Sequence, residues 1–77
     1  MGTTAQGNLR QIHALLYQII ASNEGLWLEI GRLANDEEYL AIQDPMGRVE
    51  ARLGLIEQKI GRTDDTRRLI EMIARTK

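Results

Sequence analysis

The chain has 77 residues, a net charge of −1 at pH 7, no cysteine and a single histidine. The lack of cysteine excludes disulfides and thiolate metal sites, and a chain this short builds only a marginal core unless it oligomerises. No apolar run approaches the ~18 residues that span a bilayer, and residues 1–7 do not resemble a signal peptide, so we expect a cytoplasmic protein that does not enter membranes.

The composition favours an all-α fold. Phe is absent, Pro occurs once, and no segment shows the alternation of apolar and polar residues that is typical of strands. We expect a flexible N-terminus over residues 1–7 and a single helical oligomerisation domain over residues 8–77, with Asn8 as the N-cap of the first helix.

Residues 9–40 contain the strongest pattern, a heptad repeat in which apolar residues are spaced alternately by three and four. Of its ten a and d positions, eight are aliphatic, and Asn23 and Glu37 interrupt the pattern at a. The candidate contacts between chains, the first apolar row, are Leu9, Ile12, Leu16, Ile19, Asn23, Leu26, Ile30, Leu33 and Leu40. One long helix cannot bury such a row against itself. The row therefore predicts a coiled coil or helical bundle of two to four chains, and its mixed Leu and Ile positions leave the number open.

The segment around Asn23 has two interpretations. Ser22, Asn23 and Gly25 have good turn and capping chemistry, so that a helix could end at Ala21 and restart. The heptad phase passes through this segment unshifted, however, which favours one continuous helix to at least Ala34. In that helix a buried Asn23 would fix the register between chains.

The clearest break in the sequence is at Asp44 and Pro45. Pro45 disfavours helical geometry at Asp44 and suits the first position of a new helix that Asp44 caps. We expect this second helix to run from Pro45 to about Ile60, as an antiparallel neighbour of the first rather than as the continuation of a kinked rod. Its apolar residues, the second apolar row, are Met46, Val49, Leu53, Ile56 and Ile60.

A third helix is expected from about Asp65 to Arg75, after a C-cap at Gly61. Its apolar residues are out of register with the second apolar row. This favours either a short helix that packs across the end of a bundle or a bent continuation of the second helix.

Charge is divided unevenly along the chain. Residues 1–44 hold two basic and six acidic residues, whereas residues 45–77 hold eight basic and five acidic residues. Such halves attract each other within one chain or between chains. The basic excess also provides candidate phosphate contacts at Arg62, Arg67, Arg68 and Arg75. Acidic residues lie among these arginines and no aromatic residues interleave for base stacking, so binding to nucleic acid is the weaker interpretation.

No pattern indicates catalysis, a metal site or a cofactor. His13 has no candidate nucleophile at a suitable spacing, and Gly25 and Gly31 do not form a phosphate-binding loop. The close approach of another helix is one reason for two glycines in a predicted helix.

A second contact surface is indicated by Trp27, Leu28, Tyr39 and Ile42, which partly miss the first apolar row. Either the returning second helix or a partner protein would cover them, and the returning helix is the simpler explanation.

Together these patterns predict a non-enzymatic, homo-oligomerising protein that acts as a structural, scaffolding or protein-interaction module. The alternative is a small dimeric nucleic-acid-associated regulator that uses the C-terminal arginine cluster. An enzyme is the third interpretation, because its active site would have to be built between chains.

Overall fold

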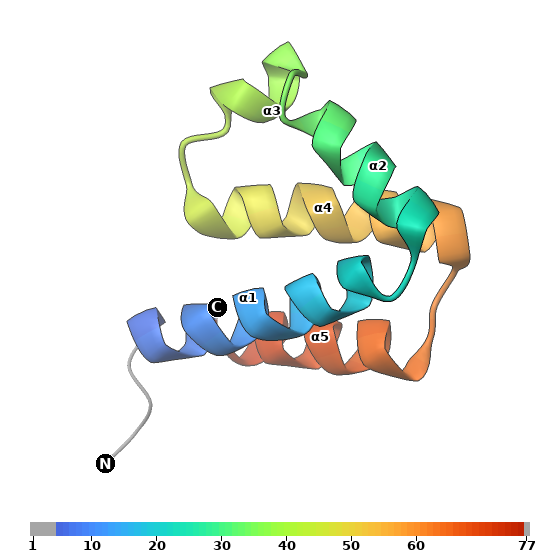
Figure 1. The fold of residues 1–77 in the computed structure, drawn as a ribbon. Helices are drawn as coiled ribbons and strands as arrows, with labels where there is room; N and C mark the ends of the chain where they lie inside the picture. Colours follow the sequence, from blue (N-terminus) through green and yellow to red (C-terminus); the bar gives the residue numbers. More distant parts are fainter. Residues whose placement is uncertain (1–4, 77) are drawn as a thin grey trace.

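The computed structural model describes residues 5–76, and within that range the chain is all-α, as predicted. Its helices are α1 (Ala5–Ala21), α2 (Glu24–Leu33), α3 (Glu37–Ala41), α4 (Pro45–Ile60) and α5 (Asp64–Thr76). Helix α1 packs on α5, α4 and α2, and α2 also packs on α4. Figure 1 shows α3 at the far end of α2, from where the chain turns back into α4.

The prediction of one continuous helix from Leu9 to at least Ala34 is wrong. Helix α1 ends at Ala21, and Asn23 is the N-cap of α2, with its side chain accepting a hydrogen bond from the backbone N–H of Leu26 at 3.1 Å. Asn23 is therefore an exposed capping residue and not a buried register residue. An N-cap of this kind satisfies a backbone donor that a helix start leaves free, which makes the restart favourable.

The expectation that Asn8 caps the first helix is wrong, because α1 begins at Ala5 and Asn8 lies inside it. Residues 5–7 of the expected flexible segment are therefore helical, and residues 1–4 lie outside the described residues. The start of α3 is fixed by a capping side chain. Asp36 caps α3 by accepting from the N–H groups of Glu38 and Tyr39.

The predicted bounds of the second helix are confirmed. Asp44 caps α4 by accepting from the backbone N–H of Gly47, Pro45 stands in the first turn, and Gly61 is the C-cap with a φ of 74°. Such a positive φ is accessible to glycine at little cost, which explains the residue type at this position.

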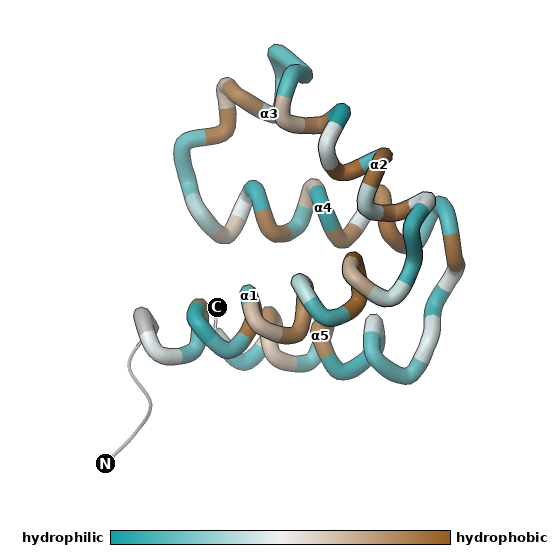
Figure 2. The backbone as a smooth tube through the Cα atoms, in the orientation of Figure 1, coloured by the Kyte–Doolittle hydropathy of each residue, from teal (hydrophilic) through white to brown (hydrophobic). Residues whose placement is uncertain are grey.

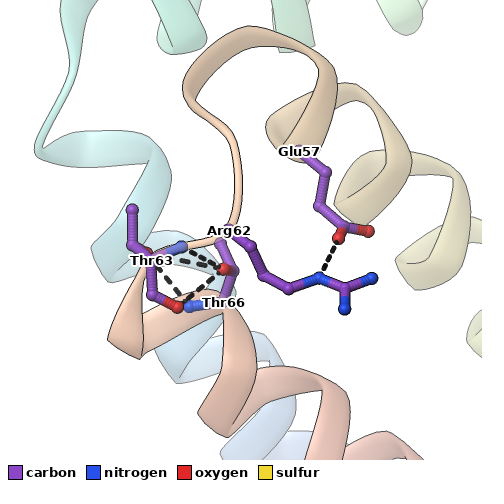
Figure 3. A network of polar contacts seen from close by, with 4 residues as sticks. All are labelled: Glu57, Arg62, Thr63 and Thr66. Atoms are coloured by element: carbon purple, nitrogen blue, oxygen red, sulfur yellow. Dashed lines mark hydrogen bonds and ion pairs between the residues drawn. The ribbon is translucent and has the colours of Figure 1, made fainter.

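The corner between α4 and α5 is held by two threonines (Figure 3). The N–H of Thr63 donates to Oγ1 of Thr66 at 2.7 Å, and the N–H of Thr66 donates to Oγ1 of Thr63 at 3.2 Å. This reciprocal arrangement is a capping box. Thr66 also donates to the carbonyl oxygen of Thr63, so its hydroxyl is satisfied although the residue is fully buried.

The core combines aliphatic side chains from α1, α2, α4 and α5. In each of these helices, hydrophobic residues recur in short stretches along the backbone (Figure 2). Its buried members are Ile12, Leu15, Leu16, Ile19, Ile20, Leu26, Val49, Leu53, Ile56, Leu69 and Ile73. Both predicted apolar rows therefore contribute to the core of one chain. Helix α5 is a separate helix after the corner at residues 61–63 and packs on α1, so the expected bent continuation of the second helix is wrong. Its apolar face adds Leu69 and Ile73 to the core.

The members of the first apolar row are not equally buried. Ile12, Leu16, Ile19 and Leu26 are buried within the chain, whereas Leu9, Ile30 and Leu33 are half-buried and Asn23 and Leu40 are exposed. Residues of α4 and α5 thus fill the row that was expected to face other chains. In the second apolar row, Val49, Leu53 and Ile56 are buried, and Met46 and Ile60 pack at the edge of the core.

Replacing Leu16 with Ala should lower the free energy of unfolding by about 2–5 kcal/mol, because it leaves a cavity at a fully buried position. Leu28→Ala is the matched control, since Leu28 is 61% exposed on α2 and its truncation should change that free energy by no more than about 0.5 kcal/mol. Urea denaturation followed by circular dichroism at low protein concentration measures both. A larger loss for Leu28→Ala than for Leu16→Ala would contradict the assigned core.

Candidate functional site

Large apolar side chains remain exposed around α2. Trp27 is 52% exposed and Leu28 is 61% exposed, although the next residue towards the N-terminus, Leu26, belongs to the core. Tyr17 of α1 is 60% exposed as well. Its ring contacts that of Trp27 edge to face, with the ring centroids 6.0 Å apart. Single exposed hydrophobic residues are ordinary, but neighbouring aromatic and aliphatic side chains are typical of an interaction surface.

A groove of about 350 Å³ lies beside this aromatic pair. Helices α1 to α4 each contribute to its lining, which consists of Tyr17, Ile20, Trp27, Ile30, Gly31, Ala34, Tyr39 and Arg52. The lining is mostly apolar, with one cationic group from Arg52. The groove is therefore suited to apolar side chains rather than to a highly charged ligand.

The α3 side of the groove is fixed by Arg48 of α4. Its Nε donates to the carbonyl oxygen of Ile42 at 2.6 Å, and its Nη2 donates to that of Leu40 at 3.3 Å. The guanidinium group lies over the ring of Tyr39, 5.5 Å from the centroid. Arg48 thus satisfies carbonyl groups at the end of α3 and holds the Tyr39 ring by a cation–π contact.

Helix α2 presents a second set of residues to solvent, on the side opposite Leu26. This set, the outer face of α2, consists of Glu24, Gly25, Leu28, Gly31 and Arg32, all exposed. Four of them are spaced at i, i+4, i+7 and i+8, which places them on one side of the helix. Within the described part of the chain, a Cβ atom added to Gly31 would meet no heavy atom within 4 Å. The fold itself therefore does not require glycine there.

The second contact surface expected from sequence is only partly covered. Tyr39 and Ile42 are half-buried, but Trp27 and Leu28 stay exposed after α4 returns along the molecule. The expectation that the returning helix covers all four residues is wrong for these two. The reason is that α4 packs on α2 where Leu26 enters the core, and Leu28 lies on the opposite side of the helix. Among the described residues of α4, only Arg52 reaches the groove beside Trp27.

The candidate phosphate contacts do not form one free basic surface. Arg62 pairs with Glu57 at 3.0 Å, and Arg75 pairs with Glu71 at 3.6 Å. Arg67 and Arg68 are exposed on α5. Because two of the four cations are already balanced by carboxylates of the same chain, a phosphate backbone would have to compete for them.

No group of three or more His, Cys, Asp or Glu side chains within residues 5–76 could hold a metal ion. In the same range, no helix combines the length and apolarity needed to cross a membrane.

His13 is half-buried on α1, and its pKa lies below the ordinary value of 6.5, first because burial disfavours the charged ring and second because the Arg52 cation repels it. Since the unfolded chain then takes up the proton more readily, the contribution of neutral His13 to stability is present above pH 6.5 and is lost as the pH falls through the lowered pKa. We expect His13→Gln to make the unfolding free energy less dependent on pH between about 7 and 5. Identical pH profiles for the two proteins in urea denaturation would contradict this assignment.

Comparison of the chain with known proteins identifies no relative. No protein-family model, no curated protein and no solved structure matches it. The function proposed below therefore rests on the residues and the geometry of this chain alone.

Proposed function

We propose that the protein is a non-enzymatic interaction module that works by self-association, as a structural or scaffolding element. The observation that supports this proposal most directly is the exposed apolar surface of α2, at Trp27 and Leu28, beside Tyr17. The buried part of the first apolar row serves the fold of one chain, so the proposed contact between copies uses α2 instead.

The energetic argument concerns side chains that the fold leaves in water. Fully burying a side chain of the size of Leu contributes roughly 1.5–3 kcal/mol, and Trp and Tyr are enriched among the residues that dominate binding energy at interfaces. Leu28 and Trp27 are more than half exposed. Association through the outer face of α2 removes the apolar area of Leu28 from water without disturbing the core.

The proposed contact is small. Helix α2 has 10 residues and is therefore about 15 Å long, whereas stable interfaces usually bury about 1,200–2,000 Å² in total. We expect a reversible dimer with a dissociation constant on the order of 10–1,000 μM, which is weak by the standards of permanent complexes.

Sedimentation equilibrium over a wide range of protein concentration tests self-association, with Leu28→Lys as the disrupting variant. A lysine at this position brings a charge into the proposed contact, so we expect the dissociation constant to rise at least about tenfold. The helix content of the monomer should be unchanged, because Leu28 lies outside the core.

Leu40→Lys is the matched control, since Leu40 is 52% exposed but lies on α3. It should leave the dissociation constant within about twofold of the wild-type value. A wild-type protein that stays monomeric at millimolar concentration would overturn the proposed function. An equal effect of both lysine variants would contradict the placement of the contact on α2.

A further inference from the structure

We propose that two copies associate by antiparallel pairing of their α2 helices about a two-fold axis at Leu28, with Glu24 of each copy opposite Arg32 of the other. This inference rests on the self-association proposed above and specifies its geometry. It concerns only the outer face of α2, whose five residues are exposed to solvent.

The charged residues and glycines of α2 are placed so that they match those of a second α2 helix that runs in the opposite direction. Consider two identical helices that pair in antiparallel fashion about residue 28. A residue that precedes residue 28 in one copy then faces the residue that follows residue 28 by the same number of positions in the other copy. Glu24 precedes Leu28 by four positions and Arg32 follows it by four, whereas Gly25 and Gly31 stand three positions before and after it. Opposite charges then face each other at both ends of the contact, and each glycine faces a glycine.

The same residues disfavour the parallel arrangement. In a parallel two-fold pair, Glu24 would face Glu24 of the second copy and Arg32 would face Arg32. Like charges that face each other are destabilising, and complementary charge fixes orientation more than it adds affinity. Both arrangements are isologous contacts that close a dimer. The charges of the outer face therefore select the antiparallel one.

The glycines give the second copy room to approach. Glycine inside a helix costs roughly 1 kcal/mol relative to alanine, and the described part of this chain places no atom within 4 Å of a Cβ at Gly31. Without side chains at positions 25 and 31, the backbone of a second helix can come close, and the projecting Leu28 side chains can pack beside it. Close approach thus provides a reason for Gly31 that the single chain lacks.

The charged residues are available for this contact. Glu24 is exposed in the first turn of α2. Arg32 pairs with Glu29 at 3.3 Å, but its side chain is 80% exposed, so this pair is weak and screened by solvent. Glu29 has a second cation, Lys59, at 3.8 Å. Arg32 can therefore exchange its partner without leaving Glu29 unpaired.

Charge reversal tests the pairing directly by sedimentation equilibrium at low salt. Glu24→Arg alone and Arg32→Glu alone each place like charges opposite each other at both ends of the contact, so each should raise the dissociation constant at least about tenfold. An equimolar mixture of the two variants should associate at close to the wild-type affinity, because one copy then has arginine at both positions and the other has glutamate. The double variant Glu24→Arg with Arg32→Glu should likewise recover association.

The matched controls make the same charge changes at equivalent helix ends. Glu38→Arg alters an exposed acid in the first turn of α3, and Arg75→Glu alters an exposed base in the last turn of α5 that pairs with Glu71. Neither should change the dissociation constant by more than about twofold. A mixture of these two control variants should associate no more tightly than either variant alone.

Gly31→Leu gives an independent test of close approach. Leucine is a better helix former than glycine and meets open space in the single chain, so the variant should unfold at higher urea concentration as a monomer. The added side chain should nevertheless weaken self-association at least about tenfold, because it keeps the two helices apart.

The outcomes separate the two proposals. A wild-type protein that is monomeric at every concentration overturns both the self-association and the pairing. A wild-type dimer that the single charge reversals do not weaken, or whose weakened variants do not recover in the mixture, overturns the antiparallel pairing and leaves self-association standing. Weaker association of each single variant, together with near wild-type affinity in their mixture, supports the antiparallel pairing.

Discussion

The turn at Ser22 and Asn23 determines which apolar surface of this chain is buried and which remains in water. Ser22 ends α1 by donating its hydroxyl to the carbonyl oxygen of Ile19 at 2.6 Å, and Asn23 starts α2 by accepting from the N–H of Leu26. With both helix ends satisfied, α2 can change direction and pack on α1 and α4. Leu26 then completes a core that α4 and α5 share, while Leu28 points away from it.

Folding and the proposed association then use different sides of one short helix. The side of α2 that includes Leu26 serves the core, and the outer face, centred on Leu28, is free for a partner. In the proposed dimer this separation has a physical consequence, since substitutions on the outer face would change the contact between chains without creating a cavity in the core. A coiled coil lacks such a separation, because its apolar row is both the core and the interface.

Much of the fold could be predicted from local chemistry. The cap and proline at Asp44 and Pro45, and the glycine at Gly61, fix the bounds of α4 in the structure as they do in the sequence. The division of the first helix into α1 and α2 could not be predicted from the apolar spacing. Spacings of three and four are common to a coiled coil and to an amphipathic helix inside a bundle. The phase continues across Asn23 although the helix does not, so periodicity alone cannot detect the break.

The candidate site was predictable only in part. Trp27 and Leu28 depart from the first apolar row, and this departure indicates a second contact surface. Whether that surface stays open depends on the path of α4, a tertiary feature that no local pattern contains. The meaning of Gly31 likewise depends on the empty space around it. Its position in a helix is visible in the sequence, but the absence of a neighbour in the described chain is not.

The claim that one chain buries its own core is tested most directly by measuring helix content and molecular mass together on dilution. Circular dichroism and sedimentation velocity over the same concentrations provide the two quantities. If the core belongs to a single chain, the helix content stays constant while any dimer dissociates to monomer. A loss of helix in step with dissociation would show that Leu16, Ile19 and their neighbours are buried between chains instead, and would contradict this account.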